Sequence, residues 1–296
     1  MQIEIDLNCI GNIQDVAKIM FPLVDPRNNK DIDLVLKLKQ YNDLGVLIAI
    51  VSYVSSARRQ GKIVRVHSST NNSYLKRINF FKELNIDVEE DFMRHPSIGR
   101  FIEMKPFSYD TCNDIVNDIS KMLDQQSILN DTVLRCFSYC ICEILDNIRH
   151  SGVDIGYIVG QSYSKFNTTE IIFVDNGKGI LCSLQENKSI EIKDDADALL
   201  KCIEKGFTCG SGGRGNGLYH TAKFIKENHG QLLIYSGESI LKIHNKKLSV
   251  EYAPYWKGTY IKMVIKNKID VDYNIVFDRD IPTSVDEFRE ELYKLW

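Results

Sequence analysis

Three short segments of this chain combine residue types and spacings that could carry out chemistry. They are EILDN at 143–147, DNGKG at 175–179 and GSGGRGNGL at 210–218. The first supplies a carboxylate and an amide, the second an acid after an apolar run, and the third a loop with little side-chain bulk. A single segment would carry little weight. Together they contain the groups needed to hold a nucleoside triphosphate with Mg²⁺.

Glu143 and Asn147 lie four residues apart in the segment 131–150, whose apolar spacing predicts a helix with Asn130 or Asp131 as its cap. Both side chains would therefore project from one helix face. A carboxylate there can orient or deprotonate an attacking group during phosphoryl transfer, and an amide oxygen can ligate Mg²⁺. The alternative is that both are ordinary polar positions on a half-exposed helix.

Asp175 follows the β-type run IIFV at 171–174, which predicts a carboxylate at the end of a buried strand. A carboxylate in that setting is costly unless it is paired or hydrogen-bonded, and the exocyclic amine of adenine is a suitable donor. Gly177 and Gly179 permit a tight turn and a close approach of the backbone to a flat ring. Asp-Asn-Gly is also a turn signal, so a simple Asx turn is the alternative.

The third segment belongs to a stretch, 206–217, in which six of twelve residues are glycine. Backbone N–H groups of such a stretch can surround phosphates, and the helix expected at 218–228 offers its N-terminus. Arg214 could add positive charge against the γ-phosphate. A flexible surface loop is the alternative. The pattern does not fit the dinucleotide fingerprint, because no strand precedes it, and it lacks the Gly-Lys-Ser/Thr ending of a P-loop.

The three segments resemble the N, G1 and G2 boxes of the GHKL ATP-binding fold. This fold is shared by gyrase-type topoisomerases, histidine kinases, MutL-type proteins and anti-sigma-factor serine kinases. EILDNIRHSG (143–152) is similar to the kinase form of the first box, and FVDNGKGI (173–180) to the adenine-contacting box. GGRGNGLYHTAKFIKENHGQL (212–232) is similar to the lid and its following helix, and Gly258-Thr259 to the closing Gly-Thr. The resemblance covers residues 105–267.

The resemblance implies a role for each matching residue. Glu143 would be the general base, Asn147 the Mg²⁺ ligand, and Asp175 the adenine contact. The implied nucleotide-binding positions are Asn147, His150, Asp175, Gly177, Gly179, Gly213, Arg214, Gly215, Gly217, Leu218 and Thr259. For His150, a hydrogen bond at the helix end is the alternative. Asn216 departs from the leucine that is common between the last two glycines of the family.

The region before residue 105 is expected to form a separate α/β unit. Its patterns predict strands and helices in alternation, at 1–7, 31–40, 44–60, 62–67 and 74–84. This order loosely resembles the βαβα module of STAS domains, found in anti-anti-sigma factors and transporter tails. Where that family has a phosphorylatable Ser or Thr, this chain has YNDLG (41–45). We therefore expect a docking or dimerisation role for this unit.

The whole pattern predicts an α/β (α+β) protein in three parts. These are a STAS-like domain (1–104), a GHKL α/β sandwich (105–267), whose mixed sheet is covered by helices on one face, and a C-terminal extension (268–296) with a short helix from Ser284. The segment 93–109, with two prolines, is the expected junction. Further helices are predicted at 111–123, 194–205 and 218–228, and strands at 157–163, 170–175, 231–237, 241–245, 247–253 and 259–266.

Composition restricts the compartment and the partners. The net charge of −3 gives no general attraction to nucleic acid or to an acidic membrane surface. The longest apolar stretch, 44–54, is too short to span a bilayer. The eight cysteines include no Cys-x-x-Cys pair, and their spacings fit neither a disulfide framework nor a zinc site. A reducing cytoplasm, with no nucleic acid and no membrane as partner, is the expectation.

Two functions remain open at this stage. The first is a Mg-ATP-binding regulatory protein in signalling, an ATPase or a protein serine/threonine kinase that transfers phosphate to a partner. The second is a non-catalytic, ATP-gated interaction module. Either implies a protein partner, including a second copy bound through the N-terminal domain. A histidine autokinase is disfavoured because 111–149 contains no histidine, and a topoisomerase because only residues 268–296 follow the ATP-binding region.

Overall fold

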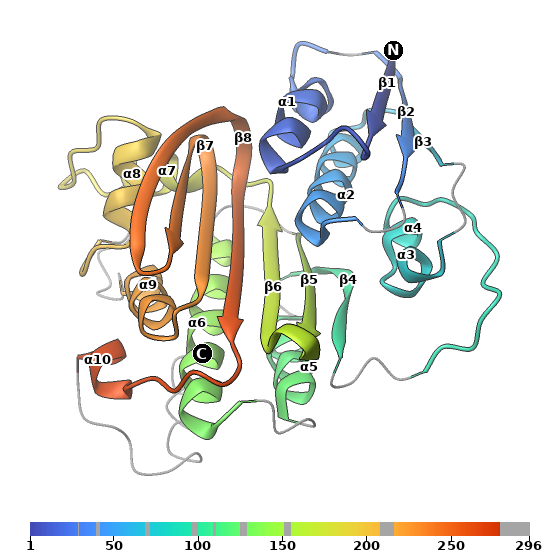
Figure 1. Cartoon of the computed structure of the whole chain (residues 1–296). Helices are drawn as coiled ribbons and strands as arrows, with labels where there is room; N and C mark the ends of the chain where they lie inside the picture. Colours follow the sequence, from blue (N-terminus) through green and yellow to red (C-terminus); the bar gives the residue numbers. More distant parts are fainter. Residues whose placement is uncertain are drawn as a thin grey trace.

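The protein combines two β-sheets with helices packed on them (Figure 1). This computed structural model describes residues 1–28, 30–39, 42–68, 72–95, 100–108, 111–124, 129–150, 155–207 and 216–278. One sheet has three parallel strands and the other has five antiparallel strands. The predicted mixed α/β class is confirmed.

The N-terminal unit alternates strands and helices. Its strands are β1 (Gln2–Asp6), β2 (Ile32–Lys37) and β3 (Val64–Ser68), parallel and in the order β1-β2-β3. Parallel neighbours need a crossover connection, and helices α1 (Ile13–Val24) and α2 (Leu44–Arg59) supply it. The helix α1 was not predicted from the sequence, and it accommodates Pro22 in its interior.

The helix α2 is buried around nearly its whole circumference. Thirteen of its sixteen residues are buried, and the Asp43 side chain caps its start by accepting from the Val46 N–H at 3.1 Å. An α-helix that is apolar on all sides must lie inside a protein. Accordingly, α2 lies between the two sheets and contributes to a core that also contains Val159 and Val174 of the larger sheet (Figure 1).

The larger sheet is entirely antiparallel. Its strands are β4 (Phe101–Phe107), β5 (Gly156–Tyr163), β6 (Thr168–Asp175), β7 (Gln231–His244) and β8 (Lys247–Lys266), in the order β4-β5-β6-β8-β7. The prediction of a mixed sheet was therefore wrong for the described strands. The pairs β5–β6 and β7–β8 are hairpins, and β8 returns beside β6 in the opposite direction.

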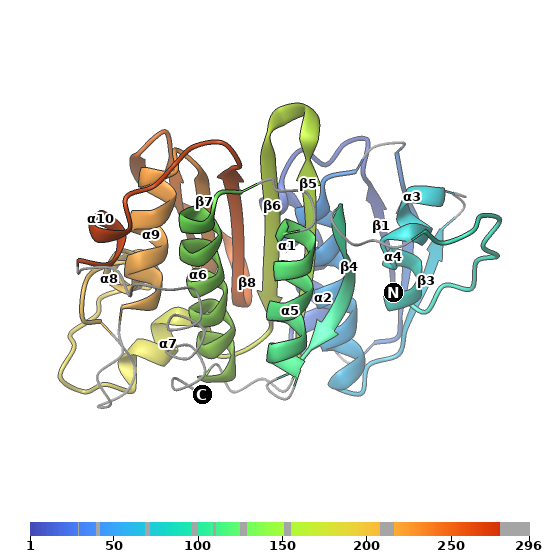
Figure 2. The same ribbon diagram turned by 90° about the horizontal axis from the view of Figure 1, so that it is seen from below.

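Helices cover both faces of this sheet, whereas one covered face was predicted. On one face lie α5 (Cys112–Asp124), α6 (Asp131–His150) and α9 (Gly217–Glu227), side by side in Figure 2. On the other face lie α1 and α2 of the N-terminal unit. Along β6, Ile171 and Phe173 face the first core, and Ile172 and Val174 face the second. The sequence of a strand that is buried on both faces is a continuous apolar run.

Several predicted elements differ in extent from the observed ones. The four strands predicted between 231 and 266 are two long strands, joined in one hairpin that has register shifts near Gly237. The helix predicted at 74–84 is divided into α3 (Ser73–Arg77) and α4 (Phe80–Glu83), because Asn79 adopts φ +64. The expected junction contains β4, which spans residue 104 and pairs with β5. The helix predicted from Ser284 lies outside the described residues.

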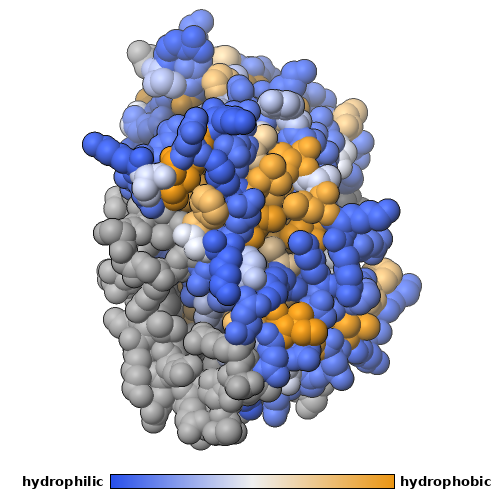
Figure 3. Space-filling model, turned by 90° about the vertical axis from the view of Figure 1, so that its left-hand side faces the viewer, coloured by the Kyte–Doolittle hydropathy of each residue, from blue (hydrophilic) through white to orange (hydrophobic). Residues whose placement is uncertain are grey.

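Three shorter α-helices and a 3-10 helix, Ser164–Phe166, complete the described fold. The α-helices are α7 (Gly179–Gln185), α8 (Asp195–Cys202) and α10 (Tyr273–Phe277). Figure 3 shows the side of the molecule at the left of Figure 1, where apolar side chains are exposed in patches separated by hydrophilic ones. Exposed apolar residues include Leu200 in α8 and Leu248 and Tyr252 in β8. Scattered apolar exposure is normal for a globular protein.

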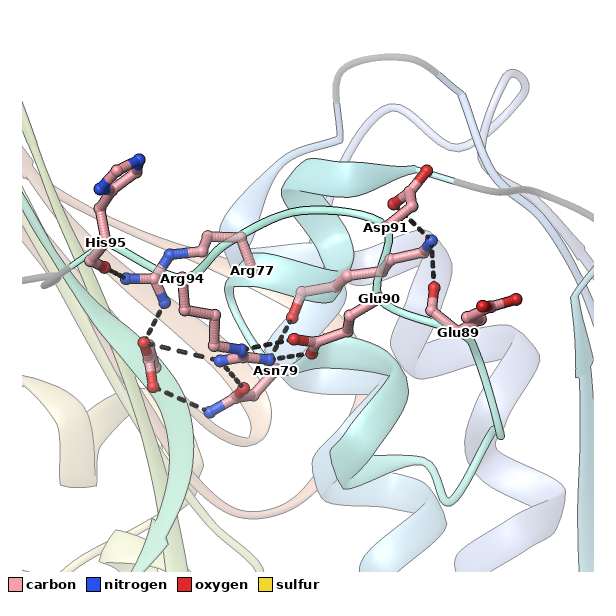
Figure 4. A network of polar contacts seen from close by, with 9 residues as sticks. Arg77, Asn79, Glu89, Glu90, Asp91, Arg94 and His95 are labelled. Atoms are coloured by element: carbon pink, nitrogen blue, oxygen red, sulfur yellow. Dashed lines mark hydrogen bonds and ion pairs between the residues drawn. The ribbon is translucent and has the colours of Figure 1, made fainter.

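A polar network ties the N-terminal unit to the edge strand β4 (Figure 4). The carboxylate of Glu103, in β4, accepts from Arg77 and from the Asn79 side chain, and it forms an ion pair with Arg94. The same network holds Lys76, whose side chain is 2% exposed and donates to the Glu89 carbonyl at 2.5 Å. The segment after α4 is thereby fixed against both α3 and β4.

We predict that Glu103→Ala destabilises the protein by about 1–3 kcal/mol, because it leaves the partly buried Arg77 and Arg94 without this acceptor. Urea unfolding at neutral pH measures the change. The matched control is Glu4→Ala, which breaks an exposed ion pair with Lys37 and should cost less than about 1 kcal/mol. Equal losses in the two variants would contradict the structural role of the network.

Candidate functional site

Asp175 ends β6, directly opposite Thr259 of β8. Its side chain is buried, with 1% of the residue exposed, and Oδ1 accepts from the Gly177 N–H at 2.7 Å. Within the described part of the chain, Oδ2 is buried and has no partner in hydrogen-bonding geometry. Burial raises the pKa of Asp175 from 3.8 to about 6, although the nearby polar groups of Gly177 and Thr259 lower it. Asp175 therefore keeps a buried carboxylate oxygen that has no hydrogen-bond partner among the described residues.

The turn after Asp175 packs against β8 so closely that position 258 has no room for a side chain. Gly258 has φ +90, and a Cβ atom built on it would lie 2.3 Å from the Asp175 carbonyl oxygen and 2.6 Å from the Gly177 nitrogen. Gly179, at φ +78, begins α7. Only glycine combines this backbone conformation with so close an approach. The sequence-predicted Asp175, Gly177, Gly179 and Thr259 are therefore brought together, with Gly258 as the residue that allows it.

Ser236 of β7 connects the two sides of this turn. Its hydroxyl accepts from the Ile180 N–H at 3.0 Å and donates to the Gly258 carbonyl at 2.8 Å. Ser236 is buried, so these two bonds take the place of water. This residue was not predicted as part of the site, because a serine in the middle of an apolar strand pattern carries no motif. Its position in a buried strand is the only sequence signal that could have drawn attention to it.

Asn176 fixes the same turn from the opposite side. Its Nδ2 donates to the Ser52 carbonyl oxygen at 3.1 Å and to the Ser52 Oγ at 2.5 Å. Ser52 belongs to α2, so the N-terminal unit touches the turn that carries Asp175. Neither residue was predicted as part of the site, because they are 124 positions apart in the chain.

Glu143 and Gly217 form a second group of predicted site residues. Asn130 caps α6 by accepting from the Val133 N–H at 2.8 Å, which confirms one of the two expected caps. Glu143, half-buried, lies against the first residue of α9: a Cβ atom on Gly217 would be 2.3 Å from its Oε2. The predicted carboxylate is thus placed at a helix N-terminus, where the helix dipole favours negative charge.

The remaining predicted residues are placed less completely. Asn147 is exposed one turn after Glu143, and Leu218 is buried behind Gly217. His150 ends α6, but its side chain lies outside the described residues, as do Gly213, Arg214 and Gly215. In the described ranges, no cluster of three or more His, Cys, Asp or Glu side chains could hold a metal.

The two flanks of the glycine-rich stretch are joined to each other. The Asn216 side chain accepts from the Gly206 N–H at 3.0 Å. The residue that departs from the family pattern thus has a structural role of its own. Asp278, just after α10, adds a second link, because its carboxylate accepts from Lys205 on one flank and from Tyr219 and Lys223 on the other. These partners hold the pKa of Asp278 well below its usual value.

When the chain is compared with known proteins, no family model matches it and no curated protein matches it. Among the residues that the structure describes, none of the helices is both long and apolar enough to cross a bilayer. The candidate site therefore rests on its own residues and contacts. These fall into the Asp175 group, at the end of β6, and the Glu143 group, between α6 and α9.

We predict that Asp175→Asn stabilises the folded protein at neutral pH. The folded-state pKa of Asp175, about 6, is above the unfolded value, so the folded carboxyl retains its proton to higher pH. Stability is therefore lost as pH rises from about 4 to about 6, at a cost on the order of 2–3 kcal/mol. Asparagine cannot ionise and avoids this cost.

Chemical denaturation of the two proteins at pH 5 and at pH 8 measures the effect. The stability advantage of Asp175→Asn over the unaltered protein should be larger at pH 8 by about 1–2 kcal/mol. Asp272→Asn is a matched control, because Asp272 caps α10 on the surface and asparagine caps a helix equally well. An advantage that does not change with pH would show that Asp175 is not held in a desolvated environment.

Proposed function

We propose that this chain is a Mg-ATP-binding regulatory protein of the histidine kinase-like ATPase class. The observation that carries the proposal is the buried Oδ2 of Asp175, which has no hydrogen-bond partner among the described residues. A buried polar atom without a partner costs free energy, which a ligand donor can recover. The exocyclic amine of adenine provides such a donor, and the close packing of Gly258 against Asp175 and Gly177 fixes the turn that carries this oxygen.

The fold supports the same proposal. The helices α5, α6 and α9 lie side by side on one face of the larger sheet, as a GHKL α/β sandwich would have them, and the alternation of strands and helices in the N-terminal unit agrees with a STAS-like domain. The antiparallel order of the described strands and the helices on the second face differ from the sandwich that was predicted. We propose the domain limits 1–104, 105–267 and 268–296 on the resemblance, although β4 crosses the first of them. A cytoplasmic location and a protein partner, including a second copy through the N-terminal domain, belong to the same proposal.

In the proposed mechanism, bound ATP would place its adenine against Asp175 and Thr259. Asn147 would hold Mg²⁺ together with phosphate oxygens, and Glu143 would accept the proton of the attacking water or hydroxyl group. The start of α9 at Gly217, beside Glu143, would contribute its free N–H groups to the phosphates. Roles for His150, Gly213, Arg214 and Gly215 are proposed on the resemblance alone.

Calorimetric titration of the full chain with nucleotides in the presence of Mg²⁺ tests the proposal. ATP and ADP should bind, whereas GTP should bind at least about 100-fold more weakly, because guanine has a carbonyl where adenine has the amine. Asp175→Ala should remove the preference for adenine. Absence of any heat from ATP at millimolar concentration would refute the proposal.

We further predict that Glu143→Gln lowers the rate of phosphate release or transfer by about 100-fold or more, since glutamine cannot accept a proton. ATP affinity should change by less than about threefold, because the side-chain shape is retained. Release of labelled γ-phosphate, alone and with candidate partner proteins, gives the rate. Asp131→Asn, in the first turn of the same helix, is the control.

The outcomes of this measurement separate the two candidate functions. Turnover by the unaltered protein that is lost in Glu143→Gln would support an ATPase or a protein serine/threonine kinase. ATP binding with no turnover, in the presence or absence of partners, would favour the ATP-gated interaction module. Turnover that survives in the variant would exclude Glu143 as the base.

A further inference from the structure

We propose that Ser52 of the N-terminal unit is a positioning residue of the nucleotide site, so that this unit sets the affinity for adenine. The inference rests on the proposed function. Ser52 would not touch the nucleotide. It would act through Asn176, by holding the turn on which Asp175 and Gly177 present their polar groups to the ring.

The contact that carries this inference is short and fully enclosed. Asn176 Nδ2 donates to the Ser52 carbonyl oxygen at 3.1 Å and to the Ser52 Oγ at 2.5 Å. Ser52 is 0% exposed and Asn176 is 8% exposed, so water cannot readily replace the serine hydroxyl. Asn176 lies between Asp175 and Gly177, whose N–H binds the carboxylate. A displacement of Asn176 therefore moves both of its neighbours.

Residues of α2 before and after Ser52 contact the larger sheet and so hold the serine in place. One turn later, Ser55 Oγ accepts from the hydroxyl of Tyr157 in β5 at 2.9 Å. At the start of the helix, a Cβ atom on Gly45 would lie 2.2 Å from the Tyr260 hydroxyl, which shows how closely α2 approaches β8. Beside Ser52, the ring of Tyr53 packs edge-on against Trp256, with centroids 4.9 Å apart. The serine is thus a fixed support.

The opposite side of the turn is fixed by different contacts. Ser236 is hydrogen-bonded to Ile180 and Gly258. Gly258 also packs directly against the backbone of Asp175, so that Asp175 cannot move toward β8. The turn is therefore clamped between β7–β8 on one side and α2 on the other. A binding group must be held within about 0.5 Å of its productive position, and supporting hydrogen bonds provide that precision. Removal of one support should loosen the adenine contact without affecting the phosphate contacts.

The test compares two serine-to-alanine variants in the same buried helix. Ser52→Ala removes the hydroxyl that receives Asn176. Ser56→Ala is the matched control, because Ser56 is also buried but its hydroxyl receives the Gln60 side chain, away from the turn. In calorimetric titrations of the full chain, we expect Ser52→Ala to weaken adenosine and Mg-ATP binding by about tenfold. We expect Ser56→Ala to change them by less than twofold.

The affinity for Mg-pyrophosphate, which lacks adenine, distinguishes a loosened adenine contact from general destabilisation. It should be unchanged in Ser52→Ala. Asn176→Ala, which leaves α2 intact, should give the same selective loss, and the double variant should be no worse than Asn176→Ala alone. Asn176→Ala also keeps the inference testable if Ser52→Ala fails to fold.

The outcomes separate this inference from the function on which it rests. An unaltered protein that binds neither adenosine nor Mg-ATP would refute the proposed function. An unaltered protein that binds both, with folded Ser52→Ala or Asn176→Ala binding them within twofold of it, would overturn the inference alone. Equal losses for adenosine and pyrophosphate would also overturn it, because they would indicate general destabilisation.

Discussion

The burial of one carboxylate at the end of β6 is the constraint on which the site depends. Asp175 is surrounded by β8, by the turn that follows it and by α2, yet only one of its oxygens is hydrogen-bonded within the described residues. Its elevated pKa reflects the cost of this arrangement. The protein compensates part of that cost with the Gly177 N–H, and the rest is compatible with a ligand that donates a hydrogen bond.

The local elements of the fold were largely predictable from the chain, because each follows from short-range periodicity. The helices at 44–60 and 131–150 and the strand ending at Asp175 have the predicted type and nearly the predicted limits. The division at Asn79 was not predictable, because a single left-handed residue leaves the apolar spacing unchanged. The hairpin β7–β8 was predicted as four strands, because residues near its register shifts interrupt the alternation.

The site residues that could be predicted from the sequence are likewise those whose arrangement depends on local contacts. Asp175, Gly177 and Gly179 lie in one motif, and their arrangement depends on a turn of a few residues. Glu143 and Gly217 come from different segments, and the structure places them in contact. Ser52 and Ser236 could not be found, because each acts through a hydrogen bond to a distant part of the chain.

The position of α2 between the sheets also determines how the protein could be divided. The same apolar helix completes the core beneath β1–β3 and covers the second face of the five-stranded sheet. Deleting the N-terminal unit would leave Ile172, Val174 and Trp256 facing water instead of isolating an intact C-terminal unit. The two halves should accordingly unfold in a single cooperative transition. Neither half could be replaced by another domain without substitutions on the surface of the other half.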